Sequence, residues 1–224
     1  EVVAADTERD NYMTAQEAME YGLIGAKLGH SFSKPIHEAL GGYAYDLVPL
    51  PDEDAARAFF ASRDFRAVNV TIPYKQLALA ACDEVDEKAA AIGAVNTVIN
   101  RSGRLYGYNT DYAGFAYMTK RAGIAFQNRT VLLLGTGGTS RTVTAVARDQ
   151  GATEVLLASR SGKNGALSYE DAMKRKDVEV VVNVSPAGMY PNNGECLLDL
   201  TAFPRLEAVA DVVYNPFHTA LLQQ

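Results

Sequence analysis

The sequence predicts an α/β protein with two domains, each built around its own sheet. In the second half, short apolar runs alternate with helical stretches, which is typical of a parallel sheet with right-handed crossovers. One of these runs, Val131–Leu134, enters the glycine-rich turn Gly135–Thr139 and then a helix. The first half shows a similar alternation that ends in a hairpin. We therefore expect a mostly parallel α/β domain, followed by a second α/β domain with a parallel sheet.

Composition bounds the functions that are open to the chain. It has 224 residues, which is enough for two modest domains, and its 48% apolar and 21% charged residues are typical of a globular protein in water. No apolar run is long enough to span a bilayer. The net charge is −6 and there is no basic block, which argues against nucleic acid as a partner.

Cysteine and histidine usage indicates a metal-free protein of a reducing compartment. Cys82 and Cys196 form no C-x-x-C motif, so we interpret both as free thiols and expect a cytoplasmic location. The three histidines are scattered and give no metal-ligand spacing. The N-terminal segment carries acidic residues, which is the opposite of the cationic start of a secretory signal.

Residues 1–20 are polar and acidic, and we treat them as an N-terminal extension without assigned chemistry. A short helix fits Thr14–Glu20, with Thr14 as its cap and Glu17 completing a capping box. The first domain is placed at residues 21–116 and the second at 117–224, because the boundary is expected within the helix predicted over Tyr112–Arg121.

The first strand, Glu20–Ile24, leads into a loop that carries two serines. Ser31 and Ser33 precede a helix with Pro35 in its first turn, and Ser33 is expected to be its N-cap. Two hydroxyls beside the free N–H groups of a helix start suit a small carboxylate. The alternative is that Ser33 only caps the helix.

The strand that ends near Ile72 carries polar residues on one face. Alternation places Asn69 and Thr71 on that face, where a hydroxylated ligand would satisfy them. Pro73 then opens a helix with Lys75 in its first turn, where the positive helix end disfavours the ammonium form. Such a lysine suits proton transfer, although a lone lysine is more often a solvated surface residue. The preceding elements are expected at Tyr45–Leu50 (strand) and Asp52–Ser62 (helix).

A hairpin is expected after the helix over Gln76–Cys82. Its strands are Gly93–Asn100 and Arg104–Tyr108, with the turn at residues 101–103. Asn109-Thr110-Asp111 then opens the next helix, so Asp111 is either a plain cap or a functional carboxylate at a strand end.

The second half is expected to alternate four strands with helices, of which the one between Arg160 and Val178 is short. The loop Ser185–Pro191 follows the carboxyl end of a strand, where α/β sheets bind ligands. The last segment, Tyr214–Gln224, is expected to start a helix. The four strands are predicted at Val131–Leu134, Glu154–Ser159, Val178–Val184 and Ala208–Tyr214.

The glycine turn predicts a dinucleotide site of the Rossmann type. A helix start attracts phosphate through its unpaired N–H groups and its dipole. The next strand ends in Arg160, with Lys163 close behind, where an NAD site would carry an acidic residue. Cations at this position favour a 2′-phosphate, so NADP is preferred over NAD. The alternative is an ordinary glycine turn with solvated charges.

Taken together, the motifs resemble those of the shikimate dehydrogenase family, from Tyr21 to the last residue. Each motif alone is weak, but six in the family's order are highly specific. The matching segments are Gly25–His37, Asn69–Lys75, Gly93–Thr97, Gly107–Asp111, Gly135–Thr142 and Asn183–Met189.

The resemblance implies an NADPH-dependent, reversible reduction of 3-dehydroshikimate to shikimate, in the biosynthesis of chorismate and the aromatic amino acids. It makes Lys75 the acid/base and Asp111 its partner, and it assigns the substrate carboxylate to Ser31 and Ser33. The remaining substrate-binding residues that it implies are Asn69, Thr71, Asn96 and Tyr214. For NADP(H), it implies Gly135, Thr136, Gly137, Gly138 and Thr139 at the pyrophosphate, Arg160 and Lys163 at the 2′-phosphate, and Met189 and Val212 at the nicotinamide.

The sequence also departs from the family pattern. Ser159 replaces an asparagine, and Ser140 and Thr142 replace small alanines. A G-x-x-M-L-x-x-Q segment and a closing helix, which the family carries after this point, are missing from the sequence. We expect the intact chain to be active and a chain that ends at Gln224 to bind substrate weakly.

Two other functions stay open. One is the same fold with quinate as substrate or NAD as cofactor; the other is a non-catalytic ligand-binding relative. The presence of both Lys75 and Asp111 argues against the second. The expected partner is a small-molecule substrate, and the expected assembly is a monomer or a homodimer.

Overall fold

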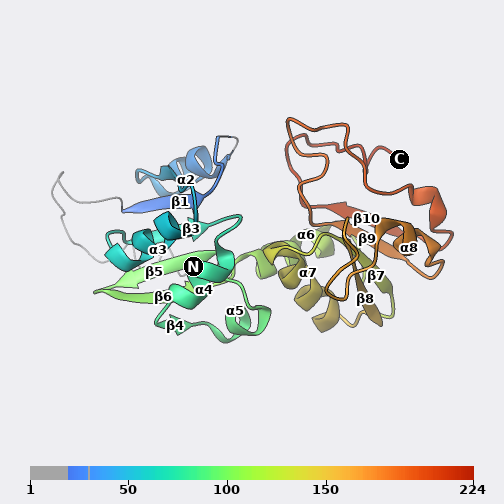
Figure 1. Ribbon diagram of the computed structural model, residues 1–224, viewed down its shortest axis with the longest axis horizontal. Helices are drawn as coiled ribbons and strands as arrows, with labels where there is room; N and C mark the ends of the chain where they lie inside the picture. Colours follow the sequence, from blue (N-terminus) through green and yellow to red (C-terminus); the bar gives the residue numbers. More distant parts are fainter. Residues whose placement is uncertain (1–19, 30) are drawn as a thin grey trace.

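The computed structural model describes residues 20–29 and 31–224, and these form two lobes (Figure 1). Each lobe is organised around its own sheet, and helix α6 (Asp111–Arg121) lies between them. The helix predicted over Thr14–Glu20 lies almost wholly outside the described residues. None of the helices in the described part of the chain is both long and apolar enough to cross a membrane.

The first sheet has six strands in the order β2-β1-β3-β5-β6-β4. β1 pairs in parallel with β2 and β3, whereas β5 is antiparallel to both β3 and β6. The antiparallel hairpin turns at Ser102 and Gly103, whose φ angles of 51° and 84° are both left-handed, as a two-residue hairpin turn requires. The strands are β1 (Tyr21–Gly25), β2 (Asp46–Pro49), β3 (Ala67–Val70), β4 (Glu84–Val85), β5 (Thr97–Arg101) and β6 (Arg104–Tyr108).

Four helices connect these strands. α3 and α5 begin where the sequence offers an aspartate cap: Asp52 accepts the N–H of Ala55, and Asp86 accepts those of Lys88 and Ala89. The core beneath them contains Phe60 and Phe65, together with apolar residues of the central strands. The helices are α2 (Ser33–Gly41), α3 (Glu53–Ser62), α4 (Lys75–Ala81) and α5 (Glu87–Ile92).

The second sheet is fully parallel, in the order β10-β9-β7-β8. Its strand β7 (Thr130–Leu134) is buried along its whole length. Val131 and Leu133 belong to the core that α7 (Gly138–Asp149) completes, while Leu132 and Leu134 belong to the core on the other side of the sheet. The other elements are β8 (Glu154–Ala158), α8 (Tyr169–Lys174), β9 (Val180–Asn183), a 3₁₀ turn at Leu200–Ala202 and β10 (Ala208–Asp211).

Three sequence predictions about the elements are wrong. Ser33 does not cap α2: Phe32 is the N-cap, and the N–H of Ser33 donates to Oγ of Ser31 at 3.1 Å. No helix starts in Tyr214–Gln224, because the described chain after β10 consists of turns and irregular backbone. β4 and most of α5 fall in the polar stretch 83–91, where no element was predicted.

Candidate active site

The two sheets bring the predicted site residues to their carboxyl edges. In the first sheet, β1, β3 and β6 run in the same direction, so Ser31, Thr71 and Asp111 all follow strand ends on one edge. Asn96 joins them because it precedes the antiparallel β5. In the second sheet, the glycine turn follows β7 and Arg160 follows β8 in the same way. This is the edge at which α/β proteins bind their ligands.

Lys75 and Asp111 form the central ion pair of the first lobe. Lys75 is the first residue of α4, Asp111 is the first residue of α6, and Nζ of Lys75 donates to Oδ2 of Asp111 at 2.5 Å. The side chain of Lys75 is only 11% exposed, whereas that of Asp111 is 37% exposed. The carboxylate offsets the unfavourable position of a cation at a helix start, and it fixes the direction of the amine.

A chain of hydrogen bonds runs through the two predicted asparagines and ends at Thr110, the residue before Asp111. Tyr45 donates its hydroxyl to Oδ1 of Asn69 at 2.6 Å, and Nδ2 of Asn69 donates to Oγ1 of Thr97 at 3.1 Å. That threonine donates to Oδ1 of Asn96 at 3.1 Å, and Asn96 also accepts the N–H of Thr110 at 2.9 Å. Thr110 is the N-cap of α6, so the network holds the helix that presents Asp111.

The serine loop lies where the lobes approach each other. The ring of Phe32, between Ser31 and Ser33, contacts the ring of Tyr214 with centroids 5.7 Å apart. Both serines are half-buried, whereas Tyr214 is 56% exposed. Thr71 packs against the end of β1, because a Cβ added to Gly25 would lie 2.4 Å from its methyl group. The structure thus brings the β1 loop, the β3 loop and Tyr214 to one side of the molecule.

The glycine turn is shaped for a close approach of backbone to a ligand. Gly135 has a φ of 126°, and a Cβ there would lie 3.1–3.3 Å from atoms of Ser185. Around Gly137 no atom lies within 4 Å of such a Cβ, so this side of the turn is open. The first turn of α7 carries no acidic residue, so its N–H groups and dipole favour an anion. The turn therefore fits a pyrophosphate.

A cleft of about 390 Å³ joins Lys75 to this turn. A Cβ at Gly138 would lie 3.6 Å from Cδ of Lys75, so the lysine and the start of α7 face each other directly. The cleft is lined by Ile72, Pro73, Lys75 and Gln76 of the first lobe and by Gly135–Thr139, Val184, Ser185 and Pro186 of the second.

Ser140 and Thr142, which stand where the family has small alanines, both form hydrogen bonds. Ser140 is 2% exposed and donates its hydroxyl to the carbonyl of Gly137 at 2.6 Å, within the glycine turn. Thr142 is 1% exposed and accepts from Nδ2 of Asn109 at 3.3 Å, which links α7 to the first lobe. Neither hydroxyl is therefore left buried without a partner.

Arg160 forms an ion pair with Glu195, a partner that sequence reasoning missed. Ser159 builds the turn that contains Arg160, since its Oγ accepts the N–H of Gly162 at 3.2 Å. Lys163 is exposed in the same loop. The side chain of Arg160 is 76% exposed, so its guanidinium stays reachable from solvent.

Two polar residues at strand ends hold the loops that carry Met189 and Tyr214. Asn183, the last residue of β9, accepts the N–H and the hydroxyl of Ser185. Asp211, the last residue of β10, accepts from Asn183 at 3.0 Å and from the hydroxyl of Thr219 at 2.7 Å. No role was predicted for Asp211, and the only available signal was a carboxylate at the end of an apolar strand. Met189 is 45% exposed, and Val212 is partly buried against the core.

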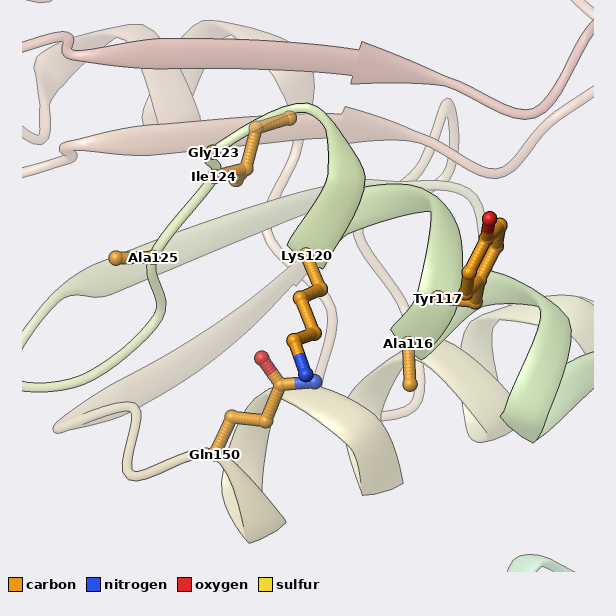
Figure 2. A pocket seen from close by; sticks show the side chains of 7 residues that line it. All are labelled: Ala116, Tyr117, Lys120, Gly123, Ile124, Ala125 and Gln150. Carbon is orange, nitrogen blue, oxygen red and sulfur yellow. The ribbon is translucent and has the colours of Figure 1, made fainter.

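A second hollow, of about 510 Å³, lies away from this edge. Figure 2 shows it between the end of α6 and the end of α7, with Lys120 and Gln150 directed toward each other. None of the predicted site residues lines it. In the described residues, no group of three or more potential ligands is placed to hold a metal ion.

Comparisons with known proteins agree with this geometry. A family model described as the shikimate dehydrogenase substrate binding domain matches residues 23–98. A Clostridium perfringens protein (strain SM101 / Type A) named shikimate dehydrogenase (NADP(+)) is 33% identical over 220 residues, which cover 91% of this chain and 81% of the relative. The chain belongs to the shikimate dehydrogenase family.

Solved shikimate dehydrogenases share the two-lobed fold. Shikimate dehydrogenase 1 from Peptoclostridium difficile superposes with a TM-score of 0.83 at 33% identity, covering 92% of this chain and 81% of that one. Shikimate 5-dehydrogenase from Thermus thermophilus, in complex with NADP(H) and shikimate, gives 0.79 at 32% identity, covering 92% and 82%. The predicted fold class, with a Rossmann-like second domain, is confirmed.

A second family model, described as Clp protease, matches residues 1–28 and overlaps the first at 23–28. The part of this match that the structure describes is β1 and the loop after it, which belong to the first sheet of the shikimate dehydrogenase fold.

Proposed function

We propose that this chain is an NADP-dependent shikimate dehydrogenase, which reversibly reduces 3-dehydroshikimate to shikimate in aromatic amino-acid biosynthesis. The observation that carries the proposal is the Lys75–Asp111 pair, whose lysine lines one wall of a cleft and faces the glycine turn of a dinucleotide fold on the other wall. We also infer a cytoplasmic enzyme, because Cys82 and Cys196 are both free thiols.

The ion pair is suited to move a proton at the reacting oxygen. NADPH, when bound, supplies the hydride for the carbonyl carbon. The ammonium of Lys75 then donates a proton to the alkoxide that forms, and in the reverse direction the neutral amine accepts the hydroxyl proton. Asp111 orients the amine and stabilises its charged form. The lysine thus provides both a positive charge and a proton at the reacting oxygen.

The substrate residues follow from their places at the edge of the first sheet. Ser31 and Ser33, beside the start of α2, would hold the carboxylate. Asn69, Thr71 and Asn96 would bind ring hydroxyls, since the hydrogen-bond network fixes the orientation of both amides. Tyr214 would approach from the second lobe, where it contacts Phe32.

The proposed cofactor residues fall into three groups, each at the end of different strands of the second sheet and each assigned to a different part of NADP. Gly135–Thr139, at the start of α7, would bind the pyrophosphate, and the openness around Gly137 supports this assignment. Arg160 and Lys163, in the loop after β8, would bind the 2′-phosphate. Met189 and Val212, which follow β9 and β10, would border the nicotinamide.

Steady-state assays on the intact chain test the proposal. Shikimate with NADP⁺ is expected to give turnover, seen as nicotinamide reduction, and quinate with NADP⁺ a smaller kcat/KM. Absence of turnover with every pairing of shikimate or quinate with NADP⁺ or NAD⁺ would contradict it. In that case, retained binding of shikimate by calorimetry would favour a non-catalytic relative.

A further inference from the structure

The ion pair between Arg160 and Glu195 joins two loops that are not neighbours in the sheet. Arg160 follows β8, whereas Glu195 belongs to the loop after β9, and β7 lies between these strands. The connection is possible because residues after Glu195 run along the sheet face opposite α7. There, Leu198 and Phe203 pack with Leu132, Leu134 and Ala172. Packing of this segment therefore sets where the Glu195 carboxylate lies.

The two partners differ in how freely they meet solvent. The side chain of Arg160 is 76% exposed, whereas that of Glu195 is 32% exposed. The loop around Glu195 is internally bonded, since its N–H donates to the carbonyl of Asn192 at 3.0 Å. The carboxylate is thus the fixed partner, and the guanidinium is the part that a ligand would approach.

Tyr169 places a third group beside this pair. Burial raises the pKa of its phenol, Arg160 opposes that rise, and Glu195 adds to it, so the phenol lies near both charges. The cluster of Arg160, Glu195 and Tyr169 lies at the end of β8, where the proposed function puts the adenosine ribose.

We propose that Glu195 determines cofactor specificity, by holding Arg160 and reducing the binding advantage of a 2′-phosphate over a 2′-hydroxyl. This rests on the proposed function, which puts the 2′-phosphate at Arg160. A guanidinium has only N–H groups to offer, so the carboxylate and the phosphate compete for them. A phosphate that binds Arg160 also comes close to the carboxylate of Glu195, and these two negative charges repel each other. A 2′-hydroxyl has no such penalty.

Calorimetric titration with two nucleotides tests this without turnover. Adenosine 2′,5′-bisphosphate carries the 2′-phosphate, and 5′-AMP lacks it. Glu195→Gln keeps the size of the side chain and removes its charge. We expect this variant to bind the bisphosphate about tenfold more tightly than wild type and to bind 5′-AMP within about twofold of wild type. Arg160→Gln should lose the preference for the bisphosphate.

Glu170→Gln is the matched control, because it removes one carboxylate from the exposed first turn of α8. It should leave both dissociation constants unchanged. The proposal is overturned if Glu195→Gln tightens both nucleotides equally, if it changes neither, or if it weakens the bisphosphate, since in that last case Glu195 would align Arg160 for the phosphate.

The same proteins separate this proposal from the function on which it rests. If wild type oxidises shikimate with NADP⁺ and Glu195→Gln does not change the selectivity between the nucleotides, only the role of Glu195 fails. If the nucleotides bind as expected and no shikimate is oxidised, the dehydrogenase assignment fails while the role of Glu195 in nucleotide selectivity stands.

Discussion

At the scale of single residues, the partial burial of His37 makes the stability of the folded state depend on pH. Its imidazole stacks on Tyr45 with centroids 4.1 Å apart, and its Nδ1 shares a hydrogen bond with the hydroxyl of Tyr43. Burial lowers the pKa of His37 below its ordinary value of 6.5. The same Tyr45 donates a hydrogen bond to Asn69, which we propose binds substrate, so the His37 ring helps to support that residue.

A pH-dependent loss of stability follows from His37. Below pH 6.5 the unfolded chain binds the proton more readily than the folded one, so the folded state loses stability as pH falls through this range. We expect the melting temperature of wild type to fall more between about pH 7 and pH 5 than that of His37→Gln, which has no titratable side chain at position 37. Equal falls in the two proteins would contradict this account.

Sequence reasoning at this scale succeeded where a residue sits in a strong local pattern. Lys75 was placed in the first turn of its helix because Pro73 marks the start. Ser33 was wrongly taken as a cap, since a serine before a proline-containing turn looks the same whether or not its own hydroxyl caps the helix. Glu195 was missed, because its partner is far away in sequence and depends on how the loop after β9 packs.

At the scale of elements, the junction from β7 to α7 depends on the backbone of Gly135. Alanine at this position would adopt a φ of 126°, which L-residues rarely reach, and its Cβ would press on backbone atoms of Ser185. We expect Gly135→Ala to raise KM for NADP⁺ about tenfold or more and to lower the melting temperature.

Gly114→Ala supplies the matched control for this substitution. Gly114 lies in α6, is exposed, and has no atom within 4 Å of an added Cβ. Alanine there should stabilise the helix by about 0.5–1 kcal/mol and leave KM unchanged. A Gly135→Ala enzyme with normal KM for NADP⁺ would show that the turn does not approach the cofactor.

Elements with a strong apolar pattern were predicted from the sequence to within a few residues at their ends. β7 has four consecutive apolar residues, and the β5–β6 hairpin has a clear turn, so both were found. β4 and α5 were missed because their stretch is polar and short, and tertiary packing decides its structure. The described chain after β10 has no helix where one was predicted, since Asp211 and Thr219 instead hold that segment in an irregular loop.

At the scale of the whole molecule, contacts beside α6 join the two lobes. Asp149, at the end of α7, accepts from Lys88 of the first lobe at 2.7 Å and from the hydroxyl of Tyr112 at 2.6 Å. Asn109 donates to the carbonyl of Ala94 at 2.9 Å and also to Thr142 of α7. We infer that the domain boundary lies within α6, near residue 116, and that these contacts limit how the lobes move about it.

The buried contact at Thr142 provides a test of this arrangement. Thr142→Val keeps the shape of the side chain and removes the hydroxyl that accepts from Asn109, which should cost about 0.5–1.5 kcal/mol. Thr144→Val, two residues along the same helix and only half-buried, should cost less. Urea denaturation measures both variants, and equal midpoints would argue against the contact between the lobes.

We propose that a lysine of one lobe transfers the proton in a cleft whose other wall belongs to the second lobe. Measurement of kcat and KM for Lys75→Ala tests it most directly, with Lys120→Ala, beside the hollow of Figure 2, as the control. We expect kcat to fall about a hundredfold or more for Lys75→Ala, with KM for shikimate little changed and Lys120→Ala like wild type. A Lys75→Ala enzyme with near-normal kcat would contradict the account.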